Sequence, residues 1–232
     1  SMVDAAVGGK TGINFHGLKN EIGCFREAEA VVVDTEFLRS LDRPNLCSGY
    51  AEMLKHALLE NRAMWTDHLL FDLASPDLAR LQELVAQSVR TKQRIVAADP
   101  HEKGLRKALN LGHTVGHAFE SLAMEQDRPV LHGYAVAWGL ACELYLSAAH
   151  AGFPAKDMHQ TVRFVREHFG LFDFNCHDYE RLYALMQHDK KNVGTEINFT
   201  LLGGIGDILL NQHLSKQQVF DSFDFFREGG IG

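Results

Sequence analysis

The sequence predicts a mainly α-helical protein with a few short strands. Three observations favour this class: long segments with apolar residues at helical spacing, several residues that typically begin or end helices, and apolar runs of β type that are all short. The chain has 232 residues, of which 46% are hydrophobic and 23% charged. A chain of this length can bury a sizeable core as one or two domains.

The first hundred residues are expected to contain a loop, a strand and two helices. Residues 1–29 are rich in glycine and polar residues, which indicates a loop, and the apolar run at 30–34 indicates a short strand. A helix is expected over residues 48–61, with Ser48 as its N-cap. Another is expected over residues 75–98, where a Ser-Pro pair favours a helix start.

The rest of the chain is expected to be mostly helical. The segment 133–150 is apolar on nearly every face, although Glu143 interrupts it, so we expect a buried helix. Ser215 and Gln218 have the spacing of a capping box, which predicts a last helix to about residue 228. The other expected elements are helices at 107–123, 155–168 and 178–187 and strands at 196–202 and 208–210.

Charge and cysteine content exclude several classes of protein. The formal net charge is −7, which argues against binding to nucleic acid or to an anionic membrane surface. The four cysteines are scattered, so neither a disulfide framework nor a thiolate zinc site is expected. No apolar run is long enough to span a membrane, and no signal peptide is visible. These features predict a cytoplasmic protein.

A histidine-rich segment carries the strongest chemical signal. His113 and His117 lie four residues apart and therefore share a helix face, and His132 follows nearby. Neutral imidazole is the commonest metal-ligating side chain, so the segment indicates a divalent-metal site. Because the chain has 13 histidines, two ordinary helix histidines are the competing interpretation. A zinc protease is disfavoured, since its pattern requires Glu where Thr114 stands.

Other candidate groups remain ambiguous from spacing alone. Glu52 and Lys55 share a helix face and form either a surface ion pair or part of a site. Lys92 lies at the edge of an apolar helical stripe and reaches either water or an anion in a cleft. The turn at residues 8–11 can approach a phosphate, although it fails the Walker pattern because the first glycine position is Asp4.

Taken together, these segments resemble the sugar-phosphate cyclase family of 3-dehydroquinate synthase. The resemblance covers nearly the whole chain, and the most specific motif is G-H-T-x-G-H-A with a downstream L-H-G. It implies a multi-helical metal- and substrate-binding domain of the dehydroquinate-synthase type over residues 41–232. Residues 1–40 are then an interdomain remnant of the NAD-binding domain, whose nucleotide-binding half is missing. The matching segments are 3–14, 17–20, 51–55, 92 with 104–106, 109–120, 131–133 and 189–191.

The resemblance also implies a role for individual residues. A divalent metal, zinc or cobalt, is held by Glu52, His113 and His132, so that His117 is a neighbour of the substrate and not a ligand. Substrate-binding or catalytic roles fall on Lys55, Lys92, Arg106, Asn110, His117, Lys190 and Asn20. Contacts with NAD fall on Asp4, Lys10, Lys19, Phe37, Leu38, Arg39 and Ser40.

The implied reaction is that of the shikimate pathway. 3-Deoxy-D-arabino-heptulosonate 7-phosphate is oxidised at C5 by NAD, loses phosphate, is reduced again and closes to 3-dehydroquinate. A homodimer is expected for the full-length protein, and little or no activity for this chain alone. The alternatives are a related cyclase of the valiolone or inosose type and a non-catalytic helical module that binds metal.

Two departures from the family pattern concern the metal segment. Tyr134 stands where the family commonly has Glu, although metal binding should survive because that position is not a ligand. The spacing between His113 and His132 is also slightly longer than usual.

Overall fold

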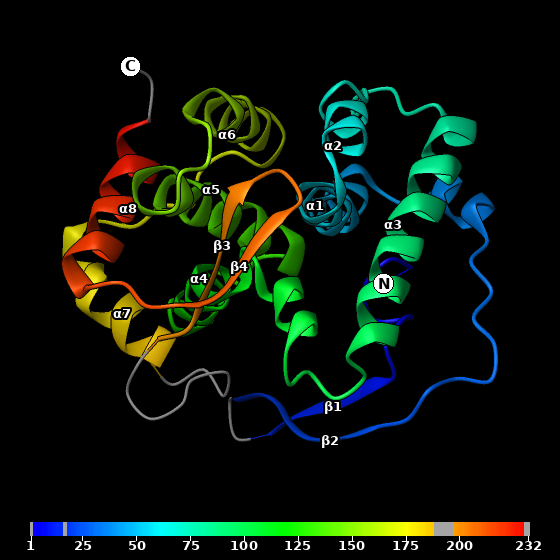
Figure 1. The fold of residues 1–232 in the computed structure, drawn as a ribbon, viewed down its shortest axis with the longest axis horizontal. Helices are drawn as coiled ribbons and strands as arrows, with labels where there is room; N and C mark the ends of the chain where they lie inside the picture. The colour runs from blue at the N-terminus through cyan, green and yellow to red at the C-terminus, as the bar shows by residue number, and fades with distance from the viewer. Residues whose placement is uncertain (1, 16–17, 188–196, 230–232) are drawn as a thin grey trace.

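The structure is a computed structural model that describes residues 2–15, 18–187 and 197–229. For residues 14–15 and 18–21 the backbone alone is described. Within these limits the protein is mainly helical with two short β-hairpins, which confirms the predicted class (Figure 1).

The described residues contain α-helices, 3₁₀ helices and two β-hairpins. The helices are α1 (Arg43–Glu60), α2 (Arg62–Leu69), α3 (Leu78–Ala98), α4 (His113–Glu125), α5 (His132–His150), α6 (Ala155–Phe169), α7 (Tyr179–Gln187) and α8 (Lys216–Glu228). The 3₁₀ helices are η1 (Thr35–Ser40), η2 (Leu105–Asn110) and η3 (Cys176–Asp178). Strands β1 (Lys10–Phe15) and β2 (Leu18–Phe25) form one antiparallel hairpin, and β3 (Phe199–Gly204) and β4 (Asp207–Gln212) form the other.

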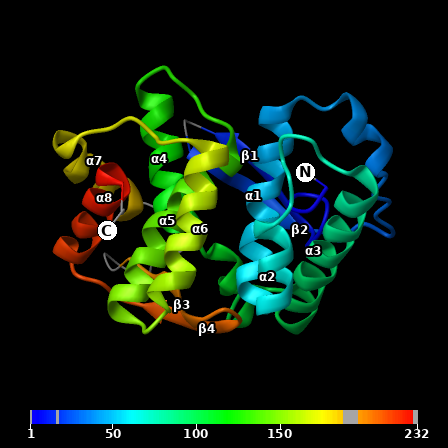
Figure 2. The same ribbon diagram turned by 90° about the horizontal axis from the view of Figure 1, so that it is seen from above.

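Helix α5 is the centre of the core. It contacts α1, α4, α6, α8 and β3, and 13 of its 19 residues are buried, as its uniformly apolar sequence predicts. Helices α1 to α3 lie on one side of the molecule and α4 to α8 on the other, with α5 facing α1 between them (Figures 1 and 2). None of the helices in the described residues is long and apolar enough to cross a lipid bilayer.

Two glycines let α5 touch its neighbours at backbone distance. A Cβ atom on Gly139 would lie 2.0 Å from the carbonyl oxygen of Gly112, just before α4. One on Gly133 would lie 1.8 Å from the carbonyl oxygen of Ser48 on α1. No side chain fits at either crossing, because real Cβ atoms do not approach other atoms so closely. The crossings therefore fix the relative positions of α1, α4 and α5.

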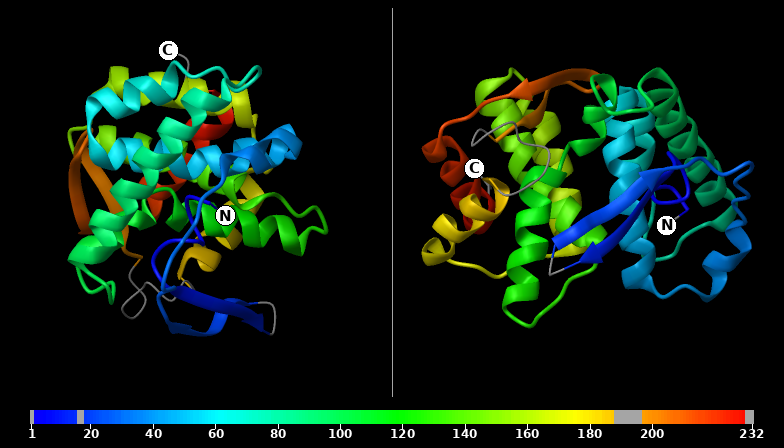
Figure 3. Two further views of the ribbon diagram at one scale, coloured as in Figure 1. Left: turned by 90° about the vertical axis from the view of Figure 1, so that its right-hand side faces the viewer. Right: turned by 90° about the horizontal axis from the view of Figure 1, so that it is seen from below.

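The secondary structure predicted for the first 34 residues was wrong. Residues 1–29 were expected to be a loop, yet β1 and β2 form a hairpin at the edge of the helical body (Figure 3). The expected strand at 30–34 is an extended segment without strand pairing, and Val32 is 90% exposed. An apolar run becomes a strand only when another strand offers hydrogen-bond partners. The hairpin was missed because its apolar side chains Ile13 and Ile22 are exposed, so its sequence lacks the alternation of a half-buried strand.

Several helix starts differ from prediction because aspartate or asparagine supplies the cap. Helix α1 begins five residues earlier than expected, since Asp42 accepts the backbone N–H of Asn45 at 2.8 Å. Helix α3 begins after Asp77 and not after the Ser-Pro pair. Helix α2, which was not predicted, begins after Asn61.

The segment expected as one helix over 107–123 is divided. Gly112 has a φ of 78°, in the left-handed region, and it separates η2 from α4. Two other predictions were confirmed: the helix expected at 155–168 is present as α6, and Ser215 and Gln218 form the capping box of α8.

Burial of His68 makes the stability of the fold depend on pH. Its Nδ1–H donates to the carbonyl of Met64 at 2.8 Å, and its buried Nε2 finds no partner among the described residues. Burial lowers the pKa of His68 to about 4. Between pH 6.5 and 4 the unfolded chain therefore binds a proton that the folded chain does not.

We expect the contribution of His68 to the free energy of unfolding to be fully present above pH 6.5 and to fall by about 3 kcal/mol as the pH decreases toward 4. Urea unfolding at pH 4–7 measures this dependence. Buried His56, whose pKa is also lowered, adds a slope of the same sign, so His68→Phe should reduce the slope by the contribution of His68, and His177→Phe, at an exposed position, should leave it unchanged. An identical slope in the unaltered chain and the His68 variant would contradict the assignment.

Candidate metal and substrate site

Three side chains from three helices converge at the junction of the two halves of the molecule. The Nε2 atoms of His113 (α4) and His132 (α5) lie 3.2 and 3.4 Å from Oε1 of Glu52 (α1). One ligand atom from each residue lies within 4.8 Å of the others. Zinc bonded tetrahedrally at about 2.0–2.1 Å separates its ligand atoms by ~3.3 Å. The three residues thus have the chemistry and spacing of a divalent-metal site.

The carboxylate of Glu52 supports the same conclusion. Its Oε1 atom is buried and accepts no well-formed hydrogen bond within the described part of the chain, while Oε2 pairs with Lys55. A buried carboxylate oxygen is costly without a partner. A cation between the two Nε2 atoms and Oε1 would supply that partner.

The outer nitrogen of each histidine has an acceptor that orients the ring. His113 Nδ1 lies 3.1 Å from the carbonyl oxygen of Leu111, and His132 Nδ1 lies 3.1 Å from Oε2 of Glu120. In the neutral imidazoles that bind a metal, proton donation from Nδ1 to these oxygens would leave the Nε2 lone pairs for the ion. This pattern is typical of metal-binding histidines.

Electrostatic interactions keep the site charged. Burial raises the pKa of Glu52, but Lys55 and His113 outweigh it and hold that pKa well below its usual value. Burial lowers the pKa of His132, but Glu120 and Glu52 outweigh it and raise that pKa to about 9. In the metal-free protein at pH 7, Glu52 is therefore ionised and His132 carries a proton, which a metal ion must displace.

Lys92 lies close enough to Glu52 and Lys55 to feel their charges, and both Lys92 and Arg106 are buried and paired within the protein. Lys92 is only 6% exposed, so it does not reach water as the alternative interpretation required; its Nζ donates to Oδ1 of Asp4 at 2.7 Å. Arg106, equally buried, donates to the carbonyl oxygens of Gly8 and Pro100, both at 2.7 Å. Burial lowers the pKa of Lys92, and Asp4 opposes that shift.

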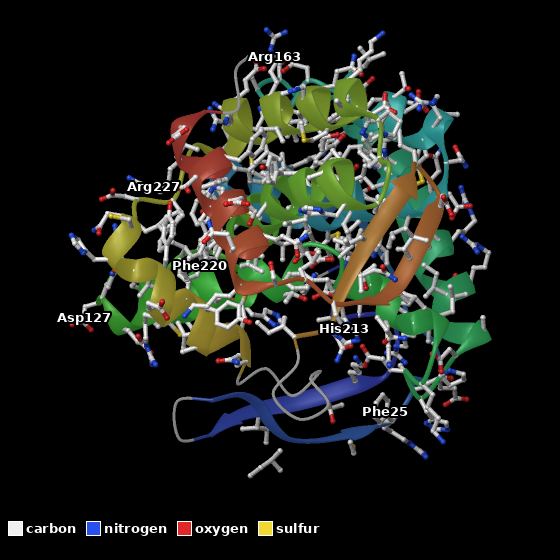
Figure 4. All side chains as sticks on the ribbon, turned by 60° about the vertical axis from the view of Figure 1, so that its left-hand side comes forward. Phe25, Asp127, Arg163, His213, Phe220 and Arg227 are labelled. Carbon is white, nitrogen blue, oxygen red and sulfur yellow. The ribbon has the colours of Figure 1, made fainter. Side chains whose placement is uncertain are left out.

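The turn before β1 and the hairpin lie over these cations. Phe25 is the last residue of β2 and lies at the end of the hairpin (Figure 4). The guanidinium of Arg106 lies 5.7 Å from its ring centroid. Lys10 on β1 forms an ion pair with Glu102, and Asn110 at the end of η2 donates to the same carboxylate at 3.3 Å. The N-terminal segment and the loop after α3 therefore meet at the site.

The remaining predicted residues are placed as follows. His117 is half-buried, and its ring centroid lies 5.3 Å from that of His113, beside the three converging ligand atoms but not among them. The segment Phe37-Leu38-Arg39-Ser40 forms most of η1, which lies against α3; Phe37 is 70% exposed. Lys190 lies outside the described residues, as do the side chains of Lys19 and Asn20.

Tyr134 occupies an aromatic position next to the site. Its ring packs edge-on against Phe169 at 5.3 Å and Trp138 at 6.0 Å, so the side chain belongs to the interface between α5 and its neighbours. It is not one of the three residues that converge.

Sequence reasoning gave no role to Glu120 and did not single out Glu102. Glu120 follows His113 by seven residues and therefore lies on the same helix face, a spacing that could have identified it as the partner of a ligand. No comparable signal exists for Glu102, whose contacts with Lys10 and Asn110 depend on the tertiary fold.

Comparison with known proteins agrees with this geometry. A helical domain with a Glu-His-His cluster and buried cations is the arrangement expected of a metal-dependent sugar-phosphate cyclase. Residues 49–192 match the family described as "3-dehydroquinate synthase C-terminal", and residues 1–48 match "3-dehydroquinate synthase N-terminal". The chain belongs to the 3-dehydroquinate synthase family.

Curated relatives extend the match along the chain. A 3-dehydroquinate synthase of Parabacteroides distasonis is 53% identical over 226 residues, which cover 97% of this chain and 64% of that protein. One from Lactococcus lactis subsp. cremoris (strain SK11) is 35% identical over 91% of this chain and 60% of its own length. The chain thus spans less than two thirds of the length of these relatives.

Solved structures share the fold. A 2-epi-5-epi-valiolone synthase from Streptomyces hygroscopicus subsp. jinggangensis 5008, with NAD⁺ and Zn²⁺ bound, has a TM-score of 0.82 at 22% identity; the match covers 98% of this chain and 63% of that chain. A 2-deoxy-scyllo-inosose synthase complexed with carbaglucose-6-phosphate, NAD⁺ and Co²⁺ has a TM-score of 0.79 at 20% identity, with the same coverage of both chains. At these identities the likeness establishes the fold alone.

The raised pKa of His132 depends on Glu120. We expect Glu120→Gln to lower the pKa of His132 from about 9 by one unit or more in the metal-free protein, because a charged acceptor is lost. An NMR titration of the histidine Cε1–H signals between pH 5 and 10 measures it. Glu125 is exposed on the same helix and pairs with Arg181, so Glu125→Gln should leave the pKa of His132 unchanged. An unchanged His132 pKa in Glu120→Gln would contradict the interaction.

Proposed function

We propose that this chain is the metal- and substrate-binding part of a 3-dehydroquinate synthase. The observation that carries the proposal is the convergence of Glu52, His113 and His132 next to Lys55, with the buried cations Lys92 and Arg106 bound to the nearby turn at residues 2–8. Membership of the family and 53% identity to a curated 3-dehydroquinate synthase support it. A homodimer in the full-length protein and a cytoplasmic location stay predictions.

In this proposal, Glu52, His113 and His132 hold zinc or cobalt, and NAD is the second cofactor. When bound, the metal supplies a Lewis acid for substrate hydroxyl groups, and NAD accepts and returns a hydride. Asp4, Lys10, Lys19, Phe37, Leu38, Arg39 and Ser40 are the proposed contacts with NAD.

The protein's own contribution is to bind and orient a polyanion. 3-Deoxy-D-arabino-heptulosonate 7-phosphate carries a carboxylate and a phosphate, which need cationic partners in a protein of net negative charge. Lys55, Lys92 and Arg106 are the proposed partners, and their burial strengthens each interaction by excluding water. Asn110, Asn20 and Lys190 are proposed to complete the set.

His117 is proposed to hold or transfer a proton near the substrate. Its ring lies beside those of His113 and His132, within reach of a molecule bound to the metal site, but outside the ligand set. Imidazole titrates near neutral pH, which suits this role.

Related cyclases are the competing enzymes. The solved neighbours of the valiolone and inosose type share the fold at 22% and 20% identity, whereas the curated 3-dehydroquinate synthases reach 53%. Assays of the full-length protein with 3-deoxy-D-arabino-heptulosonate 7-phosphate and with glucose 6-phosphate distinguish the proposed enzyme from the inosose type. Turnover of glucose 6-phosphate alone would exclude the proposed reaction.

Metal binding tests the proposed ligands. We expect one Zn²⁺ per chain. Glu52→Gln removes the charge of one ligand, and His113→Ala removes a ligand nitrogen. Each should lower the affinity for Zn²⁺ by at least about a hundredfold. Chelator competition and elemental analysis measure this, with Glu60→Gln on the same helix as the control. Unchanged zinc content in both variants would exclude the site.

Turnover tests the proposed anion-binding role of Lys92. In the full-length protein, Lys92→Met should reduce the rate of phosphate release from 3-deoxy-D-arabino-heptulosonate 7-phosphate by roughly 10²–10³-fold, because a buried charged donor is removed. The exposed Lys103→Met is the control. Zinc content should be unaffected in both variants. Full activity of Lys92→Met would show that the lysine only stabilises the N-terminal turn.

A further inference from the structure

Helix α4, which carries His113, begins without a cap of its own. Its N-cap residue is Gly112, which has no side chain to accept a hydrogen bond. The first N–H groups of an α-helix find no partners inside the helix, and a capping box satisfies two of them with side chains at the N-cap and third positions. In α4 the third position is Val115, so neither side chain can do so.

Glu143 of α5 makes both of the missing hydrogen bonds. Its Oε2 accepts the N–H of Gly112 at 2.6 Å, and its Oε1 accepts the N–H of Val115 at 3.1 Å. These are the two N–H groups that a capping box would satisfy. Gly139, one turn earlier on α5, brings the two backbones into contact and thereby lets the carboxylate reach them.

The position of Glu143 needs an explanation, because the carboxylate is fully buried in an otherwise apolar helix. Burying a carboxylate costs free energy, which hydrogen bonds and the positive end of a helix dipole offset. An apolar residue would avoid that cost in α5, but it would leave Gly112 and Val115 with unpaired N–H groups. Glu143 therefore stabilises the start of α4 and not α5, the helix that carries it.

The two bound N–H groups lie on either side of His113. Gly112 directly precedes it and Val115 follows two residues later, while Leu111, whose carbonyl orients the His113 ring, precedes Gly112. We propose that Glu143 is a positioning residue that fixes the first turn of α4 and, through it, the direction of His113 Nε2 toward the metal. This inference rests on the proposed function of Glu52, His113 and His132 as ligands.

Cobalt binding to the variant Glu143→Gln tests the inference. Glutamine keeps the shape and one acceptor oxygen, but its amide NH₂ faces the second backbone N–H. We expect the Co²⁺ affinity, measured by competition with a chelator, to fall about 10–100-fold, and the visible absorption bands of bound Co²⁺ to change.

The matched control is Ser147→Ala, one turn further along α5. Ser147 is also fully buried; its hydroxyl donates to the backbone carbonyl of Glu143 at 2.7 Å and accepts the N–H of Leu202 at 3.1 Å, so it touches neither the Glu143 carboxylate nor α4. This variant should lose stability yet keep the affinity and the bands of the unaltered chain. Equal losses of affinity in both variants, or an unaltered affinity and spectrum in Glu143→Gln, would overturn the inference.

Two further results separate this inference from the function on which it rests. An unaltered chain that binds no Co²⁺ would overturn both, whereas binding that is abolished by His113→Ala but indifferent to Glu143→Gln would overturn the inference alone. If Glu143→Gln does not fold, hydrogen exchange of backbone amides in the unaltered chain tests the inference instead. In the unaltered chain, the Gly112 and Val115 amides should exchange at least on the order of a hundredfold more slowly than free amides, and exchange at the free rate would exclude Glu143 as their partner.

Discussion

The close approach of α5 to α1 and α4 is the constraint on which the site depends. Gly133 and Gly139 bring the backbone of α5 against Ser48 and Gly112, respectively. Glu52, His132 and His113 each lie within a few residues of one of these crossings, so the distances between their ligand atoms follow from the packing of helix backbones. Such contacts vary little with side-chain rotation, which is why three distant segments can form a site of defined geometry.

Buried carboxylates connect the packing to the chemistry. Glu52 lies among Lys55 and two imidazoles, Glu120 orients His132, and Glu143 binds the start of α4. Each would destabilise the protein if it were isolated, and each is offset by a cation or by N–H donors. A site assembled in this way holds these three carboxylates in position before a metal ion binds, so their side chains need little reorganisation.

The sequence was sufficient for the class of fold, the central helix and the three converging residues, because these depend on local periodicity and on a specific motif. The buried α5 follows from its apolar faces, and α8 from the spacing of Ser215 and Gln218. The hairpin could not be predicted, since its exposed Ile13 and Ile22 carry no signal of a buried face. The contacts of Lys92 and Glu143 could not be predicted either, because their partners are 88 and 28–31 residues away and include backbone groups.

The pairing of Lys92 with Asp4 and of Arg106 with Gly8 has a consequence for binding. These cations attach the turn at residues 2–8 to the helical body, so an anion bound by Lys92 and Arg106 as proposed would compete with the turn for the same donors. Part of the free energy of that binding would then be used to release the turn. By reciprocity, any molecule that stabilises the attached turn weakens anion binding by the same factor, and one that holds the turn elsewhere strengthens it.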